Sequence, residues 1–141
     1  MNVELLNKVK AVITEEPRRY DQQAILCQGE ELDYLQPIER PPCGTVACIA
    51  GWTAVLAGPE GIERCRIWET AKDLLGIDEL QAQKLFSEID ICTYGEDDTP
   101  EMLDRWPYAF AKAYEDAESP KERAAICVER IDHFIRTEGR E

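Results

Sequence analysis

The stretch that decides the fold reads CGTVACIAGWTAVLAG and spans residues 43–58. It holds no charged residue, and Gly58-Pro59 at its end is a strong helix stop. The hydroxyl of Thr45 is suited to cap the first turn of a helix. A helix that is apolar all round is typically buried on every side. The stretch therefore predicts a central helix over residues 45–57, around which the rest of the chain packs.

Caps and prolines predict the other helices. Apolar residues at helical spacing form the first helix, and the later ones are bounded by cap residues at their ends. In chain order, the boundaries are Pro17 ending the first helix, Gly76 ending a helix that starts near residue 62, Asp78 with Gln81 opening the next, Thr99-Pro100 opening another that Pro107 interrupts, and Ser119-Pro120 with Glu122 opening the last, which runs to about Thr137.

The fold class that follows is mainly α, with five or six helices packed around the central one. Residues 18–42 lack the helical period. The regular structure that the sequence allows there is a small β-hairpin over residues 24–35, turning at Gln28-Gly29-Glu30. The rest of residues 18–42 is left without a structural prediction. A length of 141 residues is that of one domain, so a single helical domain over residues 1–141 is predicted.

The net charge of −13 is unevenly distributed. Residues 88–118 carry 10 acidic and 2 basic side chains. Such a surface repels phosphates, so direct binding to nucleic acid is not expected. The ordinary role of the charge is solubility, and the more specific one is an acidic face for a basic protein partner. The residues proposed for that face are Asp90, Glu96, Asp97, Asp98, Glu101 and Asp104.

The six cysteines and the first residues indicate the compartment. Residues 1–16 alternate charged and apolar side chains, unlike a secretory signal. The longest apolar run is about a dozen residues, whereas a membrane-spanning helix needs about 20. A cytoplasmic location is therefore expected, without a membrane partner and with reduced thiols.

Cys43 is the candidate nucleophile. If the helix begins at Thr45, the helix dipole and free amides would favour the thiolate of Cys43. A thiol enzyme also needs a base, and the single histidine, His133, lies beside Arg130 and Arg136 toward the polar side of the last helix. Both residues have simpler interpretations, Cys43 as a packed core residue and His133 as a surface side chain.

No metal or cofactor site is predicted. The cysteines form no Cys-x-x-Cys pair, and phosphate-binding and dinucleotide motifs are absent. Counting a calcium loop from Asp90 places Gly95 and Glu101 correctly, but Cys92 and Tyr94 occupy positions that need oxygen ligands.

The run Cys43-Gly44-Thr45-Val46-Ala47-Cys48-Ile49-Ala50-Gly51 resembles the Cys-Gly-Thr-x-x-Cys-Ile-Ala-Gly segment of small uncharacterised bacterial and phage proteins. Leu74-Leu75-Gly76-Ile77 and Trp106-Pro107 extend the resemblance over most of the chain. It implies a shared fold and no particular reaction.

Two hypotheses for the function follow. The favoured one is a non-enzymatic interaction or regulatory module with an acidic face, because no complete catalytic set is present. One form of it is an acidic decoy that imitates nucleic acid toward a DNA-binding protein. The alternative is a thiol-dependent enzyme or redox sensor that uses Cys43.

Overall fold

The computed structural model describes residues 1–22, 46–58, 64–87 and 106–140. These residues form six α-helices and no strand, which confirms the mainly α class. The helices are α1 (Val3–Glu15), α2 (Ile49–Ala57), α3 (Ile67–Leu75), α4 (Glu79–Phe86), α5 (Tyr108–Asp116) and α6 (Pro120–Thr137), with two 3-10 turns, η1 (Pro17–Arg19) and η2 (Arg64–Arg66). The hairpin predicted over residues 24–35 lies outside the described residues.

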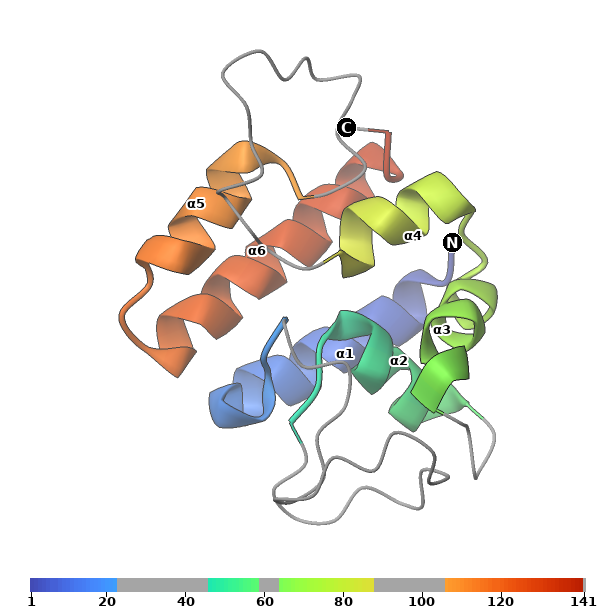
Figure 1. Cartoon of the computed structure of the whole chain (residues 1–141), viewed down its shortest axis with the longest axis horizontal. Helices are drawn as coiled ribbons and strands as arrows, with labels where there is room; N and C mark the ends of the chain where they lie inside the picture. Colours follow the sequence, from blue (N-terminus) through green and yellow to red (C-terminus); the bar gives the residue numbers. More distant parts are fainter. Residues whose placement is uncertain (23–45, 59–63, 88–105, 141) are drawn as a thin grey trace.

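The helices pack pairwise around one core. Helix α1 lies between α6 on one side and α2 and α3 on the other, α4 packs against α2 and α3, and α5 runs antiparallel beside α6 (Figure 1). All six contribute to one buried apolar cluster, which includes Leu6, Ile13, Trp52, Leu75, Leu85, Ala111 and Phe134. Helix α2 is therefore one of several core helices.

Helix α2 differs from the predicted central helix at both ends. It begins at Ile49 with Cys48 as its N-cap, so Thr45 does not cap it. Before it, Ala47 pairs with Tyr20 in a parallel bridge, in which the Ala47 amide donates to the Arg19 carbonyl at 3.0 Å. This long-range pairing satisfies backbone groups that the prediction gave to the helix.

The last turn of α2 contradicts the expectation that this helix is buried on every side. Residues Ile49 to Ala54 are buried, but Leu56 is 39% exposed and Ala57 is exposed too. The helix is therefore not buried on every side, although it has no polar face. Isolated apolar residues at a surface are common, so the all-apolar pattern overstated the burial.

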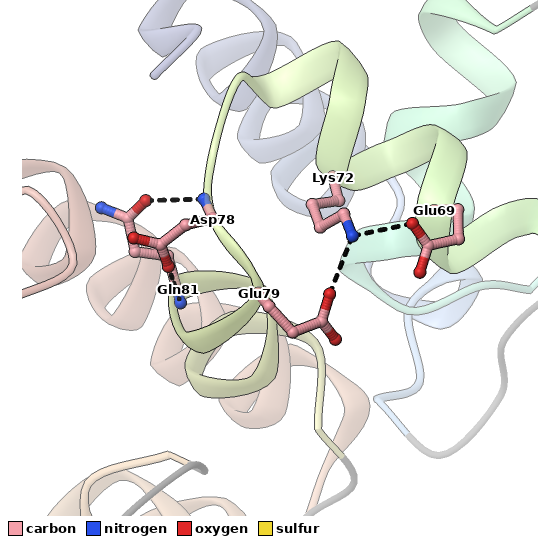
Figure 2. A network of polar contacts seen from close by, with 5 residues as sticks. All are labelled: Glu69, Lys72, Asp78, Glu79 and Gln81. Carbon is pink, nitrogen blue, oxygen red and sulfur yellow. Dashed lines mark hydrogen bonds and ion pairs between the residues drawn. The ribbon is translucent and has the colours of Figure 1, made fainter.

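Local capping signals were predicted correctly. The Asp78 side chain accepts from the Gln81 amide at 2.8 Å, and the Gln81 side chain accepts from the Asp78 amide at 3.0 Å (Figure 2). Ser119 and Glu122 form the same capping box at α6. Both boxes satisfy amides that a helix start leaves free.

The remaining boundaries agree in part. Pro107 is the N-cap of α5, so a helix starts at the predicted interruption. The helix expected from about residue 62 to Leu75 is observed as α3, which begins at Ile67 after a 3-10 turn at Arg64–Arg66. The proposed start at Thr99-Pro100 lies outside the described residues.

Two glycines in the left-handed region give a matched prediction. Gly76 has a φ of +60° and Gly139 a φ of +69°. A Cβ on Gly139 would lie 2.8 Å from Cε2 of Phe134 and 2.9 Å from Cγ of Gln81, whereas on Gly76 the nearest atom is the Met1 nitrogen at 3.9 Å. Gly76→Ala should cost about 1–2 kcal/mol of unfolding free energy for the backbone alone. Gly139→Ala should cost about 1–3 kcal/mol more for the steric overlap.

Urea denaturation of the two glycine variants measures the difference directly. Equal losses would mean that the Phe134 ring moves aside at no cost.

Candidate functional site

Cys43 lies outside the described residues, but the helix expected to activate it does not begin beside it. Helix α2 starts at Ile49, and the effect of a helix dipole falls off within about the first turn. Cys48 is the N-cap of α2, the position that the prediction gave to Thr45.

Cys48 is 2% exposed, and burial raises the pKa of its thiol to about 11. The amides of Gly51 and Ala50 lower this pKa, but they do not offset the loss of water. Burial also raises the pKa of the Cys127 thiol on α6. Both thiols are therefore protonated at neutral pH and are poor nucleophiles.

The thiols should differ widely in reactivity. Cys65 is exposed, whereas Cys48 and Cys127 are buried. With iodoacetamide near neutral pH, we expect Cys65 to be alkylated in the native protein, and Cys48 and Cys127 only after denaturation. Peptide mapping by mass spectrometry measures the order.

The same alkylation experiment tests the thiol-enzyme hypothesis, which requires Cys43 to react faster than the other five cysteines. Slow reaction of all six until denaturation would end that hypothesis. Rapid native labelling of Cys48 would contradict the burial described above.

His133 is half-buried on α6 and is engaged locally. Its ring centroid lies 5.4 Å from that of Phe110, and its Nδ1 is 2.9 Å from Nη2 of Arg136. Because a guanidinium only donates, Nδ1 accepts and a neutral ring carries its proton on Nε2. These contacts lie on α5 and α6, and they give His133 a packing role.

The six carboxylates proposed for the acidic face lie outside the described residues. The net charge of the described residues can, however, be compared with that of the rest of the chain. Residues that the structure describes carry 14 basic and 15 acidic side chains, a formal charge of −1. The rest of the chain carries 2 basic and 14 acidic side chains, a charge of −12. The helical framework is therefore nearly neutral.

Ion pairs neutralise the framework locally. Lys72 lies 2.7 Å from Glu69 and 2.8 Å from Glu79, which joins α3 to α4 (Figure 2). Hydrogen bonds to these carboxylates raise the pKa of Lys72. Lys10 pairs with Asp132 and so connects α1 to α6.

A buried polar arrangement, which the sequence did not reveal, surrounds Gln22. Its Nε2 donates to the carbonyls of Phe86 at 3.0 Å and Ser87 at 3.1 Å, at the end of α4. Its Oε1 accepts from the Tyr20 hydroxyl at 3.0 Å, and its backbone amide donates to the Tyr114 hydroxyl at 3.2 Å. Burial raises the pKa of Tyr114 to about 12, so this hydroxyl stays neutral.

Trp106 and Arg130 hold the same helix end. Nε1 of Trp106 donates to the Leu85 carbonyl at 3.1 Å, and Nη2 of Arg130 donates to the Lys84 carbonyl at 2.9 Å. We call the carbonyls of residues 84–87 with these donors and Gln22 the α4 junction. The last carbonyls of a helix lack partners within it and carry partial negative charge, which explains why donors and a cation gather here.

Arg130 is the main residue that sequence reasoning misplaced. It was assigned near the polar side of α6, but it is 0% exposed. Its guanidinium carbon lies 5.5–5.9 Å from the ring centroids of Trp106, Phe110 and Phe134. Its position three residues after Cys127 and four before Phe134 places it on the buried stripe, and this spacing was the available signal.

Within the described ranges, no three or more His, Cys, Asp or Glu side chains are placed to hold a metal ion. No helix formed by these residues combines the length and apolar character needed to cross a bilayer. No protein-family model matches the sequence, and comparison with curated proteins and with solved structures finds no similar protein.

Proposed function

We propose that the protein is a non-enzymatic interaction or regulatory module that binds a basic protein partner through an acidic segment, residues 88–105. The segregation of charge is the observation that carries the proposal. This segment holds 7 acidic residues and 1 basic residue, while the described framework is nearly neutral. Its charge of −6 is half of the −12 carried outside the described residues, and it would attract a basic partner.

A concentrated charge mainly determines which partner binds and how fast the two proteins associate, and it contributes less to the final affinity. A concentrated negative potential accelerates encounter with a basic surface, and salt screens it over about 8–10 Å. The same potential opposes direct contact with nucleic acid phosphates. The framework supports the role by holding its own cations in pairs, as Lys72 does with Glu69 and Glu79.

We also propose a cytoplasmic location. The six cysteines have irregular spacings without a Cys-x-x-Cys pair, which suits a reducing compartment. Resemblance to the bacterial and phage proteins with the Cys-Gly-Thr-x-x-Cys-Ile-Ala-Gly segment remains a proposal of shared fold.

The test uses two triple variants of equal net charge. One reverses Glu96, Asp97 and Asp98 to lysine, and the other reverses the exposed framework residues Glu15, Asp73 and Glu129. Each immobilised protein is used to capture partners from an extract of the cells that make it, between about 0.05 and 0.5 M salt.

We expect one or more basic proteins to bind the wild type and the framework variant at low salt, to be lost from the 96–98 variant, and to elute as salt rises. Equal loss from both variants would attribute binding to net charge alone and contradict the proposal. Capture that is insensitive to salt and to both reversals would contradict it as well.

A further inference from the structure

The α4 junction adjoins both ends of the acidic segment 88–105. Ser87 comes directly before the segment, and its carbonyl accepts from Nε2 of Gln22 at 3.1 Å. Trp106 comes directly after it, and its Nε1 donates to the Leu85 carbonyl at 3.1 Å. The two flanking residues of the segment are therefore fixed at the same end of α4.

The junction also adjoins residues 23–45. Gln22 comes directly before them, and Ala47 lies two residues beyond their end. The Asp21 amide donates to the Ala47 carbonyl at 3.3 Å, and the Ala47 amide donates to the Arg19 carbonyl at 3.0 Å. The residues that flank this second segment therefore lie side by side, next to Gln22.

One acceptor joins the two sets of contacts. The Leu85 carbonyl lies 3.1 Å from Nε1 of Trp106 and 3.4 Å from Nε2 of Gln22. Both donors are buried, as is the Tyr114 hydroxyl that accepts from the Gln22 amide. Loss of either donor removes a hydrogen bond from the last turn of α4. The Leu85 carbonyl can then shift, which weakens its hydrogen bond to the remaining donor. Groups that share a partner in this way are not energetically independent.

We propose that the α4 junction couples the residues flanking 23–45 to those flanking 88–105, so that a break in the contacts of one flanking pair weakens the contacts of the other. It is a conformational device built into the framework and does not require the basic partner proposed above. Opening at the junction is a local event, distinct from unfolding of the whole chain.

Hydrogen exchange on the full chain tests the coupling. Trp106→Phe keeps the ring but removes the donor beside segment 88–105. Gln22→Met removes the donor beside residues 23–45. Thr53→Val is the matched control, because it removes one buried hydrogen bond, to the Ile49 carbonyl within α2, and no donor to Arg19, Ala47 or α4.

We expect Trp106→Phe to accelerate exchange of the Asp21 and Gln22 amides at least about fivefold, as loss of one buried hydrogen bond predicts. Gln22→Met should do the same for the Ser87 amide, which donates to the Gln83 carbonyl. Thr53→Val should leave the amides of Asp21, Gln22 and Ser87 unchanged. The double variant should show less acceleration than the product of the two single effects.

Two outcomes would overturn the coupling. In one, Trp106→Phe accelerates exchange only around residues 85–87 and 106–108. In the other, all amides accelerate equally, which indicates global destabilisation. If Gln22→Met does not fold, the Trp106→Phe and Thr53→Val pair decides the question alone.

Discussion

Trp52→Ala is expected to lower the free energy of unfolding by about 3–5 kcal/mol. Trp52 lies on α2 and is 2% exposed, so its removal leaves a large cavity in the shared core. Its Nε1 donates to the Arg19 carbonyl at 2.9 Å, and the Arg19 guanidinium lies 4.6 Å from its ring centroid. The side chain therefore joins α2 to η1 by packing, a hydrogen bond and a cation–π contact.

Two further variants separate these contributions. Trp52→Phe keeps most of the packing and should cost about 1–3 kcal/mol, because the Arg19 carbonyl loses one donor and keeps that of Ala47. Leu56→Ala, at the exposed end of the same helix, should stay within about 1 kcal/mol. Urea denaturation followed by circular dichroism gives all three values. If Leu56→Ala costs as much as Trp52→Ala, the assignment of α2 to the core is wrong.

The stretch 43–58 shows what the sequence could and could not predict. The apolar run and Gly58 predicted a buried helix with the correct end. The start was misplaced because Ala47 pairs with Tyr20, a residue far away in the chain, and local capping preferences carry no information about such pairing. This misplacement matters for function, because the argument for an activated Cys43 depended on a helix that begins at Thr45.

Local signals succeeded where both partners lie within one turn. Asp78 with Gln81 and Ser119 with Glu122 form the predicted caps, and Gly76 ends α3 in the left-handed conformation. The α4 junction was not predicted, because its donors come from three distant parts of the chain. Gln22 also lies in a stretch with no helical period, which gave no reason to place it in the core.

The proposed acidic face is supported by the amino-acid sequence, because its residues lie outside those that the structure describes. Its six carboxylates lie in residues 88–105, and the structure adds the charge balance of the framework around them. Apolar residues at a regular spacing predict which face of a helix is buried. A cluster of acidic residues has no such spacing, so it does not predict how its carboxylates are arranged. The face therefore remains a prediction that the paired charge reversals test.

Arg130→Ala is expected to lower the free energy of unfolding by about 3–5 kcal/mol. The guanidinium is fully buried, donates to the Lys84 carbonyl and is surrounded by three aromatic rings. Truncation removes a donor from a helix end and leaves a cavity among those rings. Arg136→Met, at an exposed position on the same helix, is the control and should stay within about 1 kcal/mol.

Arg130→Met and Arg130→Lys distinguish packing from charge at this site. Methionine fills much of the same volume without a charge to desolvate, and buried ionic groups can often be replaced by apolar ones at little cost. Lysine keeps the charge, but its ammonium is strongly hydrated and cannot lie flat against the rings as a guanidinium does. We expect Arg130→Met to cost about 1–2 kcal/mol, for the lost donor, and Arg130→Lys to cost more.

The order of these two variants decides how Arg130 stabilises the end of α4. A cation at a helix C-terminus contributes at most about 2 kcal/mol. Lysine is the better replacement only if this attraction is larger than the free energy needed to bury its ammonium group. Methionine is the better one if the side chain acts mainly by filling space between α4, α5 and α6. Chemical denaturation at low and high salt adds a second criterion, because salt should not change a difference that arises from buried packing.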